Sequence, residues 1–337
     1  MADFENFLKT LKRQPTDKRT LFELFLNRPL YEKLAGRPMP DEDKLVSLEK
    51  LKFLVEAFRN AGYDYATTYA SNYRFERGEH SQNASVSLNE GAIITDRESF
   101  DNYPWREAGE FPLEHLDAIS SYLPENMKLN IMGPGGVFEN VIALTGFDNL
   151  CYMLADDEPL LADIFDAVGR RLVDYYTAAA RYESVGVLTS NDDWGFNTQT
   201  FFPVDVMRKY VFPWHKKIVE AIHGCGKPAL LHSCGNLAAV MDDVIDDMRY
   251  DAKHSYEDNI MRVEDAWGLW GDRICILGGI DVNFLINSPI EEIQKRCRNL
   301  LEITAGQGGY MLGSGNSIPE YIPDEKYFSM IRCIRHR

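Results

Sequence analysis

The feature that most limits the fold of this chain is a regular alternation of helical stretches and short apolar strands, which begins near residue 157. Helices and strands in this order are typical of a parallel sheet covered by helices. The predicted helices cover about 159–182, 204–223, 237–248, 263–270 and 289–304, and the strands that follow them lie near residues 187, 231, 252, 276 and 311.

The first half of the chain supplies three more strand candidates, near residues 21, 65 and 130. A short helical extension is expected within residues 1–18. A second helix is expected over 41–61, where apolar residues recur every three to four positions and Gly62 follows. Residues 80–96 alternate around Asn89-Glu-Gly91, which predicts a small β-hairpin insertion.

Eight strand candidates separated by helices predict an α/β fold of the (β/α)8 TIM-barrel type. A doubly wound open sheet is the alternative, since strand counts from sequence are uncertain. The 337 residues contain no repeat and no Ser/Gly-rich linker, so we expect one domain over 1–337. The strand near 130 ends in the turn Gly133-Pro-Gly-Gly136, whose spacing matches neither a P-loop nor a dinucleotide-binding motif.

Charge, the amino-terminal sequence and cysteine usage indicate which partners and which compartment to expect. The formal net charge of −16 leaves no basic excess for a nucleic acid or an anionic membrane surface. The acidic start lacks the basic end and apolar run of a secretory signal, and no later run is long enough to span a membrane. The six cysteines are scattered, as in proteins with reduced thiols. We therefore expect a cytoplasmic protein.

One predicted strand carries the most informative chemistry. The run Pro228-Ala-Leu-Leu-His-Ser-Cys-Gly-Asn236 reads as a buried strand, and residues two apart on a strand face the same side. His232 and Cys234 are therefore expected to project together. Such a pair makes half of a zinc site, or a nucleophile with its base, or only a core histidine beside a small buried cysteine.

Other polar residues also follow predicted strands, and in a barrel they would converge on one mouth. For several of them a structural role is equally open: an aspartate often caps a helix, and a lysine pairs with a nearby acid. These residues are Glu23, Asp192, Asp193, Lys253, His254, Glu257, Asp281, Ser314 and Asn316.

Several segments together resemble the uroporphyrinogen decarboxylase superfamily, whose members are single-domain (β/α)8 barrels. They are Asp192-Asp-Trp-Gly195, Phe202–Pro213, Leu231-His-Ser-Cys-Gly-Asn236, Ile276-Leu-Gly-Gly-Ile-Asp281 and Gly309–Pro319. The resemblance covers roughly residues 120–330 well and the amino-terminal third weakly. The decarboxylases of the superfamily use an Arg-rich amino-terminal segment, which residues 27–37 do not match.

The resemblance is closer to the corrinoid-dependent methyltransferases, in which zinc held by His-x-Cys and a later Cys activates a thiol. It implies His232 and Cys234 as metal ligands. Ser314 stands where that branch has its later Cys, and a hydroxyl is a poorer zinc ligand than a thiolate. A carboxylate from Asp193, Glu257 or Asp281, or the imidazole of His254, would then complete the ligand shell.

The leading prediction is a methyltransferase that moves a methyl group between a small molecule and a corrinoid carried on a separate protein. Asp192, Asp193, His254 and Asp281 are the catalytic candidates, Glu23, Lys253, Glu257 and Asn316 the substrate-binding ones, and His232, Cys234 and Ser314 the metal ligands. The alternatives are a cofactor-free lyase acting on a tetrapyrrole or aromatic carboxylic acid, and a barrel that only binds its ligand. A homodimer is compatible with the sequence.

Overall fold

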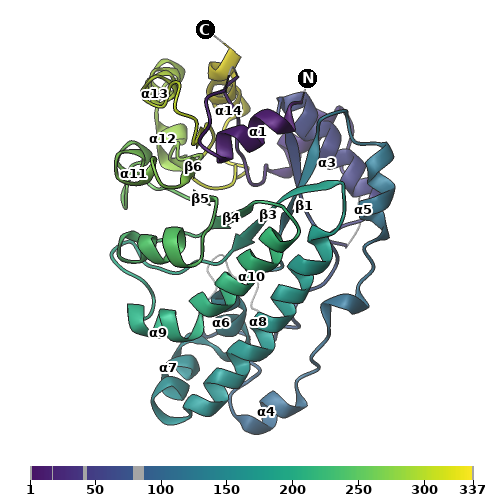
Figure 1. The fold of residues 1–337 in the computed structure, drawn as a ribbon, viewed down its shortest axis with the longest axis vertical. Coiled ribbons are helices and arrows are strands. Elements are labelled where there is room, and N and C mark those ends of the chain that lie inside the picture. Colours follow the sequence, from purple (N-terminus) through teal and green to yellow (C-terminus); the bar gives the residue numbers. More distant parts are fainter. Residues whose placement is uncertain (1, 17, 41–43, 79–86, 336–337) are drawn as a thin grey trace.

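The computed structural model describes residues 2–16, 18–40, 44–78 and 87–335. Its centre is a seven-stranded parallel sheet in which each strand pairs with the next one along the chain (Figure 1). The strands are β1 Tyr65–Tyr69, β2 Lys128–Met132, β3 Val185–Asn191, β4 Ala229–His232, β5 Ala252–His254, β6 Cys275–Leu277 and β7 Tyr310–Met311. Consecutive parallel strands curl into a barrel-like sheet with all carboxyl ends at one edge.

The eighth predicted strand, near residue 21, does not form. Residues 19–26 pair with the segment that contains β7 only at two isolated bridges, Leu21 with Leu312 and Leu26 with Ile318. On the other side, the Tyr65 hydroxyl accepts a hydrogen bond from the Glu23 N–H at 2.7 Å and donates one to the Glu23 carbonyl at 2.8 Å. The Tyr65 side chain of β1 therefore bonds the backbone groups of Glu23 that a strand ladder would use. The prediction of eight strands is wrong for this one strand, and the sheet has seven.

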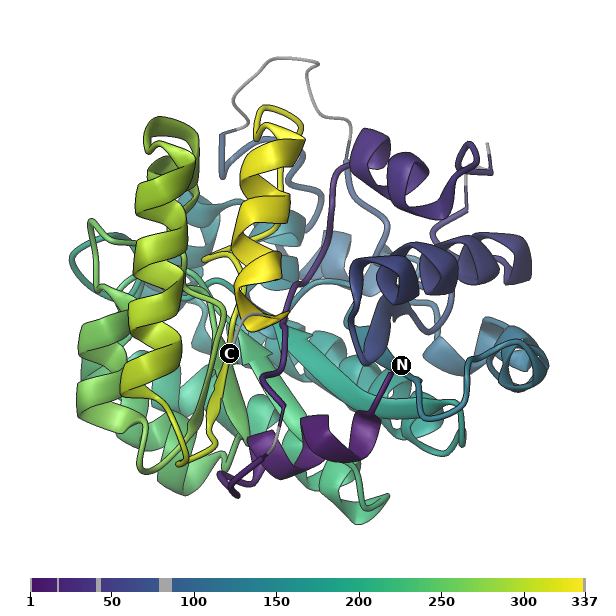
Figure 2. The same cartoon turned by 90° about the horizontal axis from the view of Figure 1, so that it is seen from above.

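Helices surround the sheet, and Figure 2 shows α13 and α14 side by side near the carboxyl terminus. Their bounds are α1 Phe4–Leu11, α2 Arg28–Ala35, α3 Leu48–Ala61, α4 Arg97–Asn102, α5 Glu114–Ala118, α6 Val137–Thr145, α7 Phe147–Asp156, α8 Glu158–Ala180, α9 Val204–Tyr210, α10 Phe212–Gly224, α11 Val263–Trp270, α12 Val282–Asn287, α13 Ile290–Ile303 and α14 Asp324–Ile331.

Local sequence explains where several helices begin and end. α3 begins later than predicted because the Ser47 side chain caps it by accepting from the Lys50 N–H, and it ends at Gly62, whose φ of 100° suits glycine. The single helix predicted over 204–223 is split at Val211, because Pro213 has no N–H to continue α9 and sits instead in the first turn of α10. Residues 238–247 form short 3₁₀ and π turns rather than one helix.

The predicted hairpin insertion is only partly within the described residues. Residues 80–86 lie outside them. In the described remainder, 88–91 form a turn and 92–95 form no strand. Instead the N–H groups of Ile93 and Ile94 both bond the Leu144 carbonyl at the end of α6. The returning segment therefore packs on a helix.

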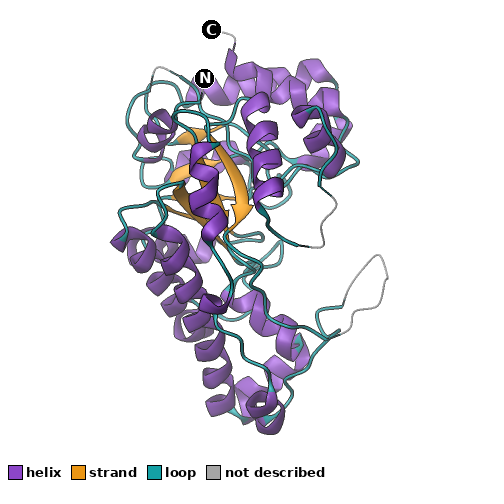
Figure 3. Cartoon of the chain, turned by 90° about the vertical axis from the view of Figure 1, so that its right-hand side faces the viewer, coloured by secondary structure: helices purple, strands orange, loops and turns teal. Residues whose placement is uncertain are grey.

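Figure 3 shows that the strands gather in one part of the molecule and that helices and loops without strands form the opposite end. This helical end contains α4 and α7, with α6 and α8 leading into it (Figure 1). The chain enters this helical end after β1 and again after β2. The helical end therefore lies beyond the carboxyl ends of the strands, where the predicted site residues also lie. No helix in the described ranges is long and apolar enough to cross a bilayer.

Candidate metal centre

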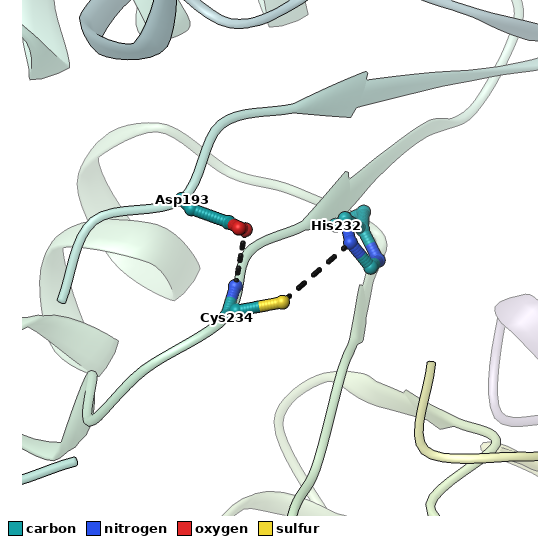
Figure 4. Close-up of side chains that lie close together, drawn as sticks. All are labelled: Asp193, His232 and Cys234. Carbon is teal, nitrogen blue, oxygen red and sulfur yellow. Dashed lines mark hydrogen bonds between the residues drawn. The ribbon is translucent and has the colours of Figure 1, made fainter. Parts of the chain in front are cut away.

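Three potential metal ligands meet at the carboxyl ends of β3 and β4. One ligand atom each from Asp193, His232 and Cys234 lies within 4.8 Å of the other two. His232 Nε2 and Cys234 Sγ are 3.8 Å apart, and the Cys234 N–H donates to Asp193 Oδ1 at 2.7 Å. Figure 4 shows the three side chains pointing toward a common space. The two neighbouring strands thus bring together residues that are far apart in the sequence.

The spacing of these atoms fits a tetrahedral zinc ion. Zinc bonds of about 2.0–2.3 Å and tetrahedral angles place neighbouring donor atoms about 3.4–3.8 Å apart. The 3.8 Å between His232 Nε2 and Cys234 Sγ falls at the upper end of this range. An imidazole, a thiol and a carboxylate are a typical zinc donor set, and three protein ligands leave a fourth position for a substrate. The residues present therefore fit the metal that the sequence predicts.

Burial keeps both the thiol and the imidazole of the site uncharged. Burial raises the pKa of the Cys234 thiol to about 12, and the Asp193 charge adds to the increase. Burial lowers the pKa of His232 to about 4, so its imidazole is neutral at pH 7. Without a metal the site therefore holds a neutral thiol and a neutral ring. Binding of a divalent cation would displace the thiol proton.

Ser255 and Asn316 complete the surroundings of the thiol. Ser255 Oγ lies 3.3 Å from Cys234 Sγ, and Asn316 Nδ2 donates to the same sulfur at 3.5 Å. Ser255 has a φ of 84°, a left-handed conformation that is uncommon outside glycine and often marks functional sites. Sequence reasoning missed Ser255. Its position directly after β5 is the only sequence signal that points to it.

His254 is buried at the end of β5 and does not reach the cluster as a fourth ligand. Its Nδ1 lies 2.8 Å from His232 Nδ1, and its Nε2 lies 3.1 Å from the Ser314 carbonyl oxygen. Burial and the neighbouring His232 lower the pKa of His254 well below the usual range. His254 therefore contacts the Nδ1 side of the His232 ring, while His232 Nε2 faces Cys234.

Ser314, the predicted third ligand, directs its hydroxyl toward other partners. The hydroxyl donates to Glu23 Oε1 at 2.6 Å and also contacts the Asn316 carbonyl, while the Ser314 N–H donates to Glu23 Oε2 at 3.2 Å. Glu23 is fully buried, and burial raises its pKa to about 8. The structure thus places Asp193, rather than Ser314, with His232 and Cys234. Glu23 contacts Ser314 and Tyr65.

Asp192 differs sharply from its neighbour Asp193. Its side chain is fully buried and accepts from the N–H groups of Phe138 and Glu139 at 2.9 and 2.8 Å, and it lies 2.8 Å from His215 Nε2. Adjacent residues at a strand end face opposite sides. Asp192 therefore anchors the first turn of α6, while Asp193 faces His232 and Cys234.

The Gly-rich turn after β2 makes this anchoring possible. A Cβ on Gly136 would lie 2.1 Å from the Asp192 carboxyl carbon, so only glycine lets the two approach. Glu139, which sequence reasoning missed, lies beside them. Burial raises its pKa to about 8, and the charges of Asp192 and Asp193 contribute. The spacing of the turn matches neither a P-loop nor a dinucleotide-binding motif, so it gives no sequence signal for Glu139.

Asp281 is held at the start of α12. Its Oδ1 accepts from the Phe284 N–H at 2.8 Å, and its Oδ2 accepts from the Asp258 N–H at 3.0 Å. Both oxygens therefore have backbone partners, as in a typical N-cap. Asp281 and Glu257 also line a pocket of 400 Å³ next to the site, together with Asn316 and Tyr321.

Lys253 is buried close to the thiol. Its ammonium group donates to the Ser255 carbonyl and lies 4.1 Å from the centre of the Tyr256 ring. Burial lowers the pKa of Lys253 to about 8, although Cys234, Asp193 and Glu257 act in the opposite direction. Burial also raises the pKa of Glu257, with Asp281 and Asp193 contributing. Both residues therefore interact electrostatically with Asp193 of the cluster.

Fold and site together define an α/β barrel-like protein with a zinc-compatible donor set at the mouth. The sequence matches the uroporphyrinogen decarboxylase (URO-D) family over residues 108–337. The chain therefore belongs to the URO-D family, as the resemblance predicted. The comparison with curated proteins finds no significant match.

Comparison with solved structures shows a similar fold over nearly the whole chain. A methyltransferase from Methanosarcina mazei superposes with a TM-score of 0.72 at 17% identity, over 98% of this chain and 97% of that one. At this identity the likeness shows a shared fold. A β-L-arabinopyranosidase from Geobacillus stearothermophilus reaches a TM-score of 0.39 at 14% identity, over 95% of this chain and 75% of that one.

Proposed function

We propose that the protein is a zinc-dependent methyltransferase that moves a methyl group between a small molecule and a corrinoid carried on a separate protein. The observation that carries the proposal is the donor set of Asp193, His232 and Cys234 at the strand ends. Membership of the URO-D family and the fold shared with a methyltransferase support it.

Three side chains would hold the zinc: Asp193, His232 and Cys234. The ion would keep a substrate thiol deprotonated at neutral pH and fix its position for methyl transfer. The chain's own residues set the environment of that position. Asn316 and Ser255 contact the Cys234 sulfur, and the buried Lys253 adds a positive charge beside the cluster. The ammonium group would attract an anionic substrate into the site.

The pocket lined by Glu257, Asp281 and Asn316 provides room for a small molecule beside the cluster. Two aromatic side chains after the strands are unusually exposed: Phe196 at 47% and Tyr321 at 66%. Exposed aromatic residues favour contact with another protein. Their exposure supports the proposal that a partner protein carrying the corrinoid docks at the carboxyl ends of the strands.

The lyase alternative would use an aspartate at the end of β3. Asp192 already bonds two backbone N–H groups and lies beside His215, which leaves Asp193 as the acid available for that chemistry. A spectroscopic assay for loss of carboxylate from a tetrapyrrole distinguishes the two functions, because only the lyase alternative predicts turnover without metal.

The direct test is a zinc measurement on protein purified without chelators, together with a Cys234→Ala variant. We expect about one zinc per chain in the wild-type protein and a large loss in the variant. The second step is methyl transfer between methylcobalamin and a panel of small thiols, before and after zinc removal. An absence of zinc from both proteins, or equal turnover with and without zinc, would contradict the proposal.

A further inference from the structure

The two imidazoles of His232 and His254 form a chain that ends at a fixed carbonyl group. Their Nδ1 atoms lie 2.8 Å apart, and His254 Nε2 lies 3.1 Å from the Ser314 carbonyl oxygen. His254 is fully buried and its ring packs 5.0 Å from the ring of Phe22. The far nitrogen of the chain, His232 Nε2, faces the Cys234 sulfur at 3.8 Å.

The carbonyl group at the end of this series of hydrogen bonds determines which atom donates in each of them. A carbonyl oxygen only accepts, so His254 Nε2 must carry the proton. Both rings are buried, where a charge would be costly, so each ring holds one proton. His254 Nδ1 is then a bare acceptor and His232 Nδ1 must donate to it. This leaves His232 Nε2 without a proton, with its lone pair directed toward the cluster.

Two glycines hold the carbonyl group in place. The Ser314 carbonyl oxygen also accepts from the Gly279 N–H at 2.9 Å, which fixes its direction. A Cβ on Gly278 would lie 2.1 Å from that oxygen and 3.0 Å from His254 Nε2, and Gly278 has a φ of 66°. The Gly278-Gly279 pair therefore allows β6, His254 and Ser314 to approach one another.

We propose that His254 is a positioning residue that fixes the proton of His232 on Nδ1 and so keeps His232 Nε2 free to bind a metal ion. The consequence for metal binding rests on the proposed zinc function. The tautomer of His232, however, is a property of the metal-free protein. Partners of this kind orient a ligating histidine and raise its basicity, and their loss typically weakens metal binding about 10–100-fold.

The first test is the tautomer of His232 in the metal-free wild-type protein, measured by ¹⁵N NMR of protein labelled at histidine. The chain has seven histidines, so single variants can assign the signals. We expect the proton of His232 on Nδ1 and that of His254 on Nε2. A His232 proton found on Nε2 would overturn the proposal, whatever the metal measurements show.

The second test compares the zinc affinity of two His254 variants by competition with a chromophoric chelator. His254→Phe keeps the ring but removes the acceptor, and we expect zinc binding about 10–100-fold weaker. His254→Asn keeps an acceptor close to the position of Nδ1, and we expect most of the affinity to return. A general packing defect would not be rescued by the smaller amide.

His223→Asn is the matched control. His223 lies in α10 beside Asp251, at the opposite end of the strands, with its Nε2 2.8 Å from Asp251 Oδ2. We expect it to leave both zinc affinity and the His232 tautomer unchanged. If the wild-type protein binds zinc and His254→Phe binds it equally well, the inference fails and the proposed function stands. If the wild-type protein binds no zinc, the proposed function fails, and the NMR result alone decides the role of His254.

Discussion

Asp193 and Asp192 are adjacent in the sequence, yet their substitutions should have opposite effects. Asp193→Asn keeps an oxygen that can accept from the Cys234 N–H, which lies 2.7 Å from Asp193 Oδ1 in the wild-type protein, but replaces the carboxyl group of a proposed zinc ligand by an amide. Structural zinc sites bind with about 10–16 kcal/mol in total. An even share for one of four ligands is about 2.5–4 kcal/mol, which corresponds to a loss of about 10²–10³-fold in affinity.

Asp192→Asn should instead destabilise the fold. The carboxylate is fully buried, accepts two backbone hydrogen bonds and lies 2.8 Å from His215 Nε2. Hydrogen bonds to a charged group contribute about 1.5–3 kcal/mol each, and an amide retains only part of this. We expect a loss of about 2–4 kcal/mol in the free energy of unfolding, with little change in the affinity of the folded protein for zinc.

Both variants are measured with the same two assays, chelator competition for zinc affinity and denaturant unfolding of the metal-free protein for stability. The reasoning requires Asp193→Asn to lose affinity with nearly unchanged stability, and Asp192→Asn to do the reverse. If Asp192→Asn releases zinc while Asp193→Asn retains it, the assignment of the two aspartates to metal and fold is refuted.

Three further predictions concern other parts of the site. Gly278→Ala should destabilise the protein by at least about 1 kcal/mol, because of its φ of 66° and a Cβ 2.1 Å from the Ser314 carbonyl oxygen; thermal unfolding unchanged from wild type would contradict this. Burial raises the pKa of Glu23 to about 8 from an ordinary value of 4.5, so the folded state disfavours the ionised carboxylate and the wild-type protein should lose stability as the pH rises from 4.5 through 8. Glu23→Gln should flatten that dependence in denaturant unfolding measured across this range, and an equally steep curve for the variant would argue against it. Chelation of the metal should lower the thermal midpoint of the wild-type protein but not that of Cys234→Ala, since only the former gains stability from bound zinc; equal shifts in both would count against the site.

Much of the fold could be predicted from the sequence because its signals are local. The run 128–132 carries Leu129, Ile131 and Met132 and ends at Gly133, and β2 has these bounds. The helix predicted over 159–182 forms as α8 over Glu158–Ala180. The eighth strand could not be predicted correctly, because the hydroxyl of Tyr65 replaces its ladder, and that contact joins residues 42 positions apart.

The site shows the same division between local and long-range information. The period of a strand was enough to place His232 and Cys234 on one face, and they do lie together. The sequence could not decide which of Asp192 and Asp193 faces the mouth, because this depends on the register of β3 against its neighbours. Nor could it show that Ser314 would turn toward Glu23, a residue from the other end of the chain.

The central claim is that Asp193, His232 and Cys234 bind one metal ion. Anomalous diffraction at the zinc edge from crystals of the zinc-loaded protein tests it most directly. The account predicts a single strong peak about 2.0–2.3 Å from His232 Nε2, Cys234 Sγ and an Asp193 oxygen. A zinc peak elsewhere in the molecule, or no peak between these three side chains, would contradict it.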